Sequence, residues 1–140
     1  MSTAIKISLV ASGLFLLAGL LTGILKYQRI MQSPEHRAPV YVNIAHRASL
    51  LYSFAALVIS RLLEGSPLSP AVQVWAASVP LAFFAVTIGG YLAFGLKNHT
   101  NNIFNRRDFI TTWYMYLLII GEVGGIGLIF GGFLYTTLKG

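Results

Sequence analysis

The sequence predicts an all-α integral membrane protein, folded as a four-helix bundle with up-down-up-down topology. Apolar residues make up 56% of the 140 residues and charged residues only 10%, whereas soluble domains carry about 25% charged residues. The mean hydropathy of +0.71 is correspondingly high. Four long apolar runs joined by short polar segments account for most of the chain, so the lipid bilayer is its expected environment.

The four runs lie near 7–25, 42–63, 71–96 and 109–138. Each has the roughly 20 residues that cross a hydrocarbon core at 1.5 Å per residue. We interpret the first run as a retained helix and not as a signal peptide, because the segment from Ala18 to Gly23 shows no convincing cleavage pattern. Together the runs predict a single transmembrane domain over 1–140, with no separate soluble domain.

Segments rich in proline, glycine and polar residues predict the three connections between these runs. The first, from Lys26 to Tyr41, contains two prolines, and the second is the tight turn from Gly65 to Pro70. The third is the Asn-rich segment 97–108. Connections this short predict that consecutive helices are antiparallel neighbours.

The net charge of +6 is distributed unevenly between the two ends of the predicted bundle. Three basic residues lie at one end: Lys6, Arg61 and Lys139. Seven flank the first and third connections: Lys26, Arg29, Arg37, Arg47, Lys97, Arg106 and Arg107. The positive-inside rule therefore predicts that loops 26–41 and 97–108 are cytoplasmic and that both termini are outside, in the cell (inner) membrane. This distribution indicates contact with the lipid bilayer and not with nucleic acid.

Stripes of small residues predict how the helices pack. Ser49, Ser53 and Ser60 share a helical face with His46, which predicts that this face of the second run looks into protein and not into lipid. A similar stripe in the first run predicts contact with a neighbouring helix: Ser8, Ser12, Gly19 and Gly23. Six glycines in the fourth run suit close approach of helices or subunits: Gly121, Gly124, Gly125, Gly127, Gly131 and Gly132.

Composition narrows the metal chemistry, and one histidine stands out. The chain has no cysteine, which excludes disulfides, iron–sulfur clusters and thiolate ligands, and no zinc-peptidase or di-iron spacing is present. His36 and His99 fall in polar loops, where a solvated side chain is expected. His46 opens an apolar helix, so one ring nitrogen would donate to a carbonyl while the other binds iron. The alternative is a helix-end histidine bonded to a neighbouring helix or to a lipid headgroup.

Basic residues surround the predicted level of His46 in the membrane. They are candidate partners for the acidic groups of a planar cofactor inserted between helices: Arg37, Arg47, Lys97, Arg106 and Arg107. Haem b fits a site that combines one nitrogen ligand with such cations. The structural alternative is that these residues fix the topology and contact anionic lipid, as basic residues at cytoplasmic helix ends commonly do.

Two tyrosines are candidate catalytic residues. Tyr91 lies near the end of the third run at the predicted depth of His46, where its hydroxyl would orient or protonate a bound oxygen. Tyr52 lies six residues after His46, on a different face, and would serve the pocket of a second subunit. The alternative for such residues is the interfacial aromatic belt, which we expect for Trp113, Tyr114 and Tyr116.

Glu122 is the third candidate catalytic residue. It lies near the middle of the fourth run, where an ionised carboxylate costs about 3 kcal/mol. We therefore expect it to be protonated or hydrogen-bonded across a helix interface. Proton transfer or contact with a substrate is the functional alternative to a structural hydrogen bond.

In these features the chain resembles the styrene oxide isomerase and hydroxylaminobenzene mutase family of small four-helix membrane proteins. The resemblance in layout covers nearly the whole length. The family's helix-opening Ala-His matches Ala45-His46, and its aromatic end of the third helix is similar to Tyr91-Leu92-Ala93-Phe94. The chain departs from the isomerase pattern at Tyr52-Ser53, in place of Asn-Gly, and at Phe83, in place of an acidic residue.

The resemblance implies a redox-neutral isomerase. Haem b would be held by His46 near a subunit interface in a trimer, and ferric iron would act as a Lewis acid on a small apolar oxygenated substrate, an epoxide or an arylhydroxylamine. Two other interpretations remain open. One is a non-catalytic cytochrome b subunit, and the other is a structural accessory subunit of a larger membrane complex.

Overall fold

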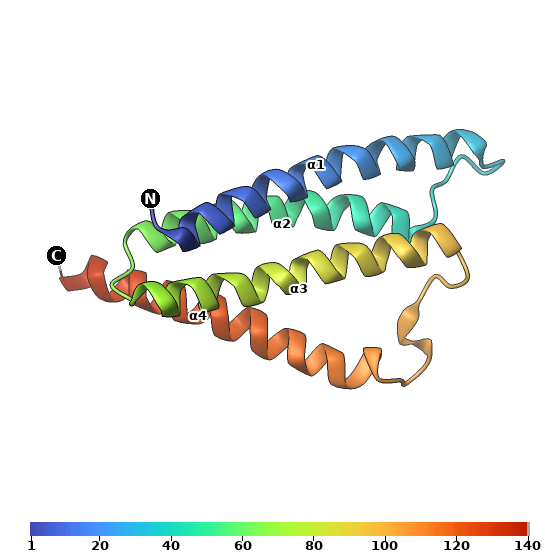
Figure 1. Ribbon diagram of the computed structural model, residues 1–140. Helices are drawn as coiled ribbons and strands as arrows, with labels where there is room; N and C mark the ends of the chain where they lie inside the picture. Colours follow the sequence, from blue (N-terminus) through green and yellow to red (C-terminus); the bar gives the residue numbers. More distant parts are fainter. Residues whose placement is uncertain (140) are drawn as a thin grey trace.

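The computed structural model describes residues 1–139, and these form an all-α bundle. The four long helices are α1 (Thr3–Gln32), α2 (Val40–Glu64), α3 (Pro70–Lys97) and α4 (Met115–Lys139). A 3₁₀ turn η1 (Ile103–Asn105) and a π-helical turn η2 (Ile110–Tyr114) precede α4. The helices alternate in direction, so both termini and the α2–α3 turn lie at one end, the termini end, and the other two connections lie at the loop end (Figure 1). All four helices are long and apolar enough to span a membrane, which confirms the predicted fold class.

The first helix is longer at both ends than the predicted run 7–25. It begins after Ser2, whose hydroxyl accepts a hydrogen bond from the Ile5 backbone N–H at 3.3 Å, and such an N-cap satisfies one free donor of the first turn. It continues to Gln32 and ends at Ser33, which is extended because Pro34 follows it. Hydropathy alone missed the last turns because they are polar, although no residue in them breaks a helix.

The small-residue stripes of α1 and α2 face each other, as their spacing predicted. Ser49, Ser53 and Ser60 are buried, and Ser12 donates a hydrogen bond from its hydroxyl to the Ser53 carbonyl oxygen at 2.9 Å. A Cβ atom on Gly19 would lie 2.5 Å from the Leu50 side chain. In a bilayer, helix association depends on such close packing and on interhelical hydrogen bonds, because lipid supplies no hydrophobic drive between helices.

Two glycines of α4 bring its backbone close to α3. Gly121 packs on Phe83, and a Cβ on Gly125 would lie 2.6 Å from the Ala76 carbonyl oxygen and 2.9 Å from the Pro80 ring. Pro80 has no N–H, so it leaves the Ala76 carbonyl without its helical partner, and the glycine backbone approaches there. Of the six glycines of the fourth run, Gly121 and Gly125 therefore pack within the bundle, as close approach of helices predicted.

Three other glycines of α4 behave differently, whereas Gly132 packs on the α2–α3 turn. A Cβ atom would meet nothing within 4 Å at Gly124, Gly127 or Gly131, so these positions lie on an open face of the helix. Only Ile129 is buried along α4. Figure 1 shows the reason, because α4 diverges from α3 toward the loop end.

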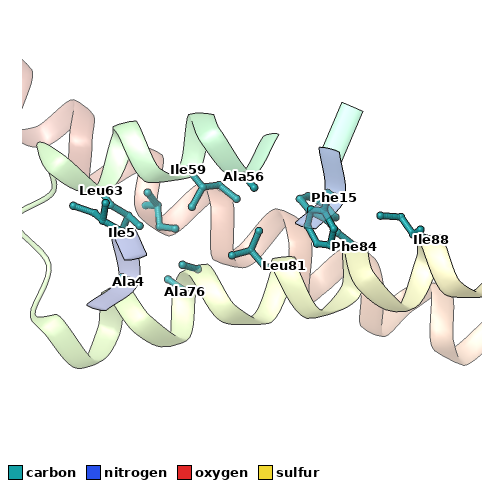
Figure 2. Close-up of a cluster of buried hydrophobic side chains, with 12 residues drawn as sticks. Ala4, Ile5, Phe15, Ala56, Ile59, Leu63, Ala76, Leu81, Phe84 and Ile88 are labelled. Carbon is teal, nitrogen blue, oxygen red and sulfur yellow. The ribbon is translucent and has the colours of Figure 1, made fainter. Parts of the chain in front are cut away.

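The hydrophobic core lies between α1, α2 and α3 and extends from the termini end to mid-bundle (Figure 2). Phe15 of α1 and Phe84 of α3 meet edge to face, with ring centroids 6.5 Å apart. Leu81 and Ile88 lie one turn on either side of Phe84 on the same helix face. This packing fixes the rotation of α3, and with it the direction of Thr87 and Tyr91 discussed below.

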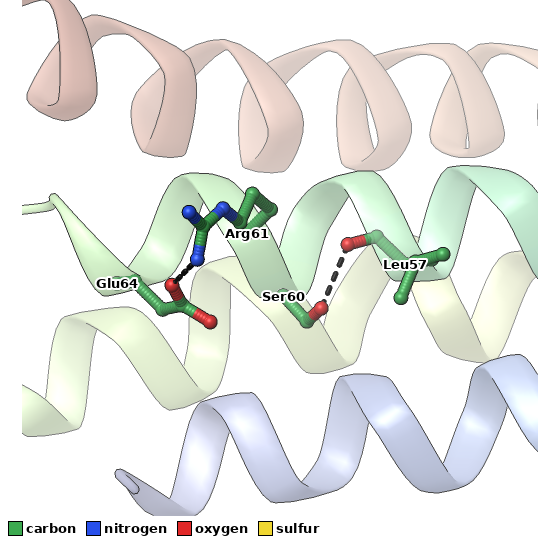
Figure 3. A network of polar contacts seen from close by, with 4 residues as sticks. All are labelled: Leu57, Ser60, Arg61 and Glu64. Carbon is green, nitrogen blue, oxygen red and sulfur yellow. Dashed lines mark hydrogen bonds and ion pairs between the residues drawn. The ribbon is translucent and has the colours of Figure 1, made fainter.

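A surface ion pair marks the termini end of α2. Arg61 is paired with Glu64 one turn on, and Ser60 donates from its hydroxyl to the Leu57 carbonyl oxygen at 2.7 Å (Figure 3). Both charged side chains are largely exposed, so the pair contributes little to stability.

Two polar contacts anchor the third connection. The Tyr41 hydroxyl accepts a hydrogen bond from the Ile103 backbone N–H at 2.8 Å. Asp108 accepts hydrogen bonds from the backbone N–H and the hydroxyl of Thr111 at 2.9 and 3.1 Å. The backbone hydrogen bond from Thr111 holds the pKa of the Asp108 carboxyl below its ordinary value. These contacts position the chain that returns into α4.

Candidate functional site

The divergence of α4 opens a cavity between α3 and α4 toward the loop end. Its volume is about 470 Å³, within the range of small-molecule sites. Most of its wall is apolar, from residues such as Val86, Phe94, Ile110, Met115 and Leu118. Four polar residues also line it: Thr87, Tyr91, Lys97 and Tyr114. An apolar chamber with a few polar groups is typical of a site for a small, largely apolar ligand.

Tyr52, Tyr91 and Glu122, the three candidate catalytic residues, lie near one another, but only Tyr91 lines this cavity, and Glu122 lines a separate hollow with Phe84. Tyr52 lies within electrostatic range of Tyr91, Glu122 and Tyr114, and Tyr91 lies within range of the last two as well. They come from three helices, α2, α3 and α4. We call Tyr52, Thr87, Tyr91, Tyr114 and Glu122 the polar cluster.

Aromatic stacking fixes the tyrosines of the polar cluster. Tyr52 stacks on Phe84 of α3, with centroids 4.1 Å apart and an interplanar angle of 5°. Tyr91 stacks on Tyr41 at 5.9 Å, and Tyr114 lies 6.0 Å from Phe83. The Tyr52 ring therefore faces α3, and its expected role in the pocket of a second subunit stays a prediction.

Three atoms of the polar cluster are buried without a hydrogen-bond partner in the described part of the chain: Thr87 Oγ1, Tyr114 OH and Glu122 Oε1. Each such atom costs about 1–3 kcal/mol relative to a satisfied one. A helical threonine usually bonds to the carbonyl one turn back, as Thr22 does with Ala18 at 2.7 Å. A ligand with a hydrogen-bonding oxygen would satisfy the hydroxyls that face the cavity.

Replacing Thr87 with valine is expected to stabilise the ligand-free protein by about 1 kcal/mol. Valine keeps the branched shape and removes a buried hydroxyl that has no partner. The free energy of unfolding in detergent, from a denaturant titration, measures the change. Thr22→Val is the matched control, because it removes a hydroxyl bonded to two carbonyls and should not stabilise. A loss of stability in Thr87→Val would mean that this hydroxyl is satisfied.

His46 does not join the polar cluster. Its Nδ1 lies 2.8 Å from the Gly19 carbonyl oxygen of α1, and a Cβ on Gly23 would lie 3.1 Å from its Cε1 atom. A carbonyl only accepts, so Nδ1 carries the proton and Nε2 of the neutral ring keeps its lone pair. This is the hydrogen bond that the sequence predicted for a histidine ligand, and it equally matches the predicted alternative of a bond to a neighbouring helix.

The imidazole and the polar cluster lie on different faces of α2. Tyr41 and Tyr52 are eleven residues apart and both stack on α3, whereas His46 is rotated from them by roughly 130° and faces α1. His36 and His99 are exposed in the connecting loops. Within residues 1–139, no group of three His, Cys, Asp or Glu side chains is placed to hold a metal ion, and a single axial histidine needs no such group.

The basic residues are spread over separate hollows at the loop end. Lys97 lines the α3–α4 cavity, and Arg106 lines a hollow next to it. Arg107 lines a third hollow, on the η2–α4 side, and Arg37 lines a fourth, beside the end of α1. Arg47 is exposed on α2, directly after His46. Only Lys97 and Arg106 are therefore associated with the cavity.

Sequence reasoning missed Thr87 and Tyr114. Tyr114 was expected in the interfacial belt with Trp113 and Tyr116, which are indeed exposed, but its hydroxyl is buried. Thr87 lies one turn before Tyr91 and therefore on the same face of α3. That spacing is the one signal in the sequence that indicates it.

No known protein family matches the chain, and neither a curated protein nor a solved structure shows significant similarity to it. The resemblance to the isomerase and mutase family is therefore still a prediction. Any function assigned to the chain depends on the cavity, the polar cluster and His46.

Proposed function

We propose that the chain is a membrane-embedded isomerase that binds a small apolar oxygenated substrate, of the epoxide or arylhydroxylamine type, in the α3–α4 cavity. The observation that carries the proposal is the proximity of Tyr52 and Glu122 to Tyr91, which lines that cavity. These residues are far apart in the sequence, and the chemistry of each one separately predicts a catalytic role. Their convergence supports a common role.

The residues of the polar cluster have distinct roles in this proposal. The hydroxyls of Tyr91 and Tyr114, on opposite walls of the cavity, donate hydrogen bonds to the substrate oxygen and orient it. Glu122, with one carboxyl oxygen free of any partner, takes up or returns a proton during the rearrangement. The apolar wall excludes water, so that rearrangement is favoured over hydrolysis.

The cofactor in this proposal is haem b, with His46 as the axial ligand. The Nδ1 hydrogen bond to Gly19 fits this role because it leaves Nε2 free for a metal and orients the ring. When bound, haem would supply a Lewis acid for the substrate oxygen. The exposed Arg37 and Arg47 are the cations available for its acidic groups, since Lys97 and Arg106 face the cavity and the adjoining hollow.

The proposal includes a homo-oligomer, with three subunits by resemblance. His46 and the polar cluster lie on different faces of α2, so a cofactor on His46 of one subunit would serve the cavity of the next. We also propose that the loop end is cytoplasmic, in the cell (inner) membrane, because seven of the ten basic residues flank its connections.

A complementation experiment tests this arrangement. Protein purified from cells with adequate iron is expected to show a Soret band and to isomerise a phenyl-substituted epoxide to an aldehyde. His46→Ala and Tyr91→Phe should each be inactive alone. Their co-expression should restore activity, because mixed oligomers contain sites with one intact His46 and one intact Tyr91. Colourless wild-type protein, or mixed oligomers as inactive as the single variants, would contradict the proposal.

A structural accessory subunit is the second candidate function, favoured by the open face of α4. Gly124, Gly127 and Gly131 lie on that face with no side chain over them, and such surfaces suit a helix of another subunit. Colourless protein that co-purifies in a fixed ratio with a larger membrane complex would favour this candidate. A low-spin haem with two axial ligands would instead favour the non-catalytic cytochrome b interpretation.

A further inference from the structure

The α3–α4 cavity adjoins a second hollow beneath the third connection. This loop hollow has a volume of about 440 Å³. Three residues belong to the walls of both spaces: Phe94, Ile103 and Ile110. The two spaces are therefore neighbours along one line, from mid-bundle to the loop end.

The two spaces differ in chemical character. The wall of the cavity is mostly apolar apart from its hydroxyls, whereas the loop hollow is lined by His99, Arg106 and polar loop residues. Lys97 adds a second permanent positive charge, because it lies in the cavity wall at the last turn of α3. The pair of spaces thus has one apolar end and one cationic end.

One carboxylate also lines the loop hollow. Asp108 accepts hydrogen bonds from the backbone N–H and the hydroxyl of Thr111. Its charge is therefore used in the turn that starts η2, while no hydrogen bond or ion pair is found for the side chains of Lys97 and Arg106 within residues 1–139. The balance of available charge in this region is positive.

The dimensions suit an elongated molecule. Ten residues separate Thr87, at the inner end, from Lys97, at the outer end, which corresponds to about 15 Å along a helix. A ligand that fills this length would place one end against the hydroxyls of Thr87 and Tyr114 and the other against cations.

We propose that the ligand of the α3–α4 cavity is an anionic amphiphile, with an apolar body in the cavity and a carboxylate or phosphate group held by Lys97 and Arg106. The inference rests on the proposed function for the location of the substrate site, and it narrows the proposed substrate class to an oxygenated molecule that also carries an acidic group. Charge-assisted hydrogen bonds from lysine and arginine give such a site its preference for an acid over an uncharged analogue.

Displacement of a fluorescent fatty acid from protein in an uncharged detergent tests the inference. Decanoate is expected to displace the probe at about one tenth of the concentration that decanol needs, because a charge-assisted hydrogen bond contributes about tenfold or more in affinity. Decyl phosphate distinguishes the two head groups, and tight binding of either acid supports the inference. Equal binding of both acids and decanol would overturn it.

Charge variants locate the acidic group. Lys97→Gln and Arg106→Gln should each weaken decanoate about three- to tenfold and leave decanol unchanged. Arg61→Gln is the matched control, because Arg61 lies at the termini end and is paired with Glu64. If neither Lys97→Gln nor Arg106→Gln weakens decanoate more than Arg61→Gln does, the inference is wrong.

A glycine pair separates this inference from the proposed function. Gly90 lines the cavity, and a Cβ there would meet nothing within 4 Å, so the side chain of Gly90→Leu is expected to occupy part of the cavity. Gly89→Leu is the matched control on the open side of α3. If Gly90→Leu blocks the binding of decanol and decanoate while Gly89→Leu does not, the cavity is a ligand site. If decanol and decanoate also bind equally well to the wild-type protein, the preference for an anionic ligand is wrong. Failure of the proposed function is seen separately, in the Soret band and in epoxide turnover.

Discussion

Replacing His46 with alanine is expected to leave the purified protein colourless. A single axial histidine carries the whole attachment of iron in this proposal, so its removal should abolish the Soret band and not weaken it by a fraction. The absorption spectrum, with pyridine extraction to count haem per chain, measures the effect. Isomerase activity should fall to background in the same preparation.

Two matched variants accompany this prediction. His36→Ala and His99→Ala change the other histidines, both exposed in loops, and each should keep the full haem content. Unfolding of His46→Ala is checked by circular dichroism and gel filtration, because the side chain also bonds Gly19 across the α1–α2 interface. A folded His46→Ala protein with wild-type haem content would end the proposal of a haem at this position.

Gly23 of α1 leaves space for the His46 ring. A Cβ at this position would lie 3.1 Å from Cε1 and 3.3 Å from Nδ1 of His46. Glycine therefore leaves the room in which the imidazole reaches the Gly19 carbonyl. The requirement links the small-residue stripe of α1 to the candidate metal ligand, although the sequence indicated only packing for that stripe.

The helices and their topology were predictable from the sequence because each apolar run has about the length that a bilayer requires and the connections between the runs are short. The serine stripe of α2 was predictable too, because helical periodicity determines a face whatever the partner is. The helix ends were less accurate. Hydropathy measures burial in lipid, whereas the last turns of α1 are polar residues with good helix propensity that lie beyond the apolar run.

The site was predictable only in part. Tyr52, Tyr91 and Glu122 were selected because polar groups in a bilayer need a partner or a function. Their convergence, and the addition of Thr87 and Tyr114, depends on the angle at which α4 leaves α3, and periodicity does not determine that angle. The same limit applied to the glycines of α4, where spacing alone does not distinguish a packed glycine from an open one.

Gly125→Leu is expected to destabilise the protein by about 3 kcal/mol, at the upper end of the usual range for overpacking. Even the Cβ atom would lie 2.6 Å from the Ala76 carbonyl oxygen and 2.9 Å from the Pro80 ring. Both neighbours are rigid, because one is backbone and the other is a ring closed on the backbone. The strain is therefore not relieved by a change of rotamer, and α4 must move away from α3.

Gly124→Leu is the matched control for this prediction, one residue earlier in the same helix. A Cβ there meets nothing within 4 Å, so the variant should gain up to about 1 kcal/mol from the better helix propensity of leucine. Denaturant titrations in detergent compare the two free energies of unfolding. Because the cavity lies between the same two helices, beyond the Gly121–Phe83 contact, displacement of α4 by Gly125→Leu should also weaken decanol binding. Equal stability of the two leucine variants would mean that α3 and α4 do not meet at Pro80. The contact that sets the separation of the cavity walls would then be absent.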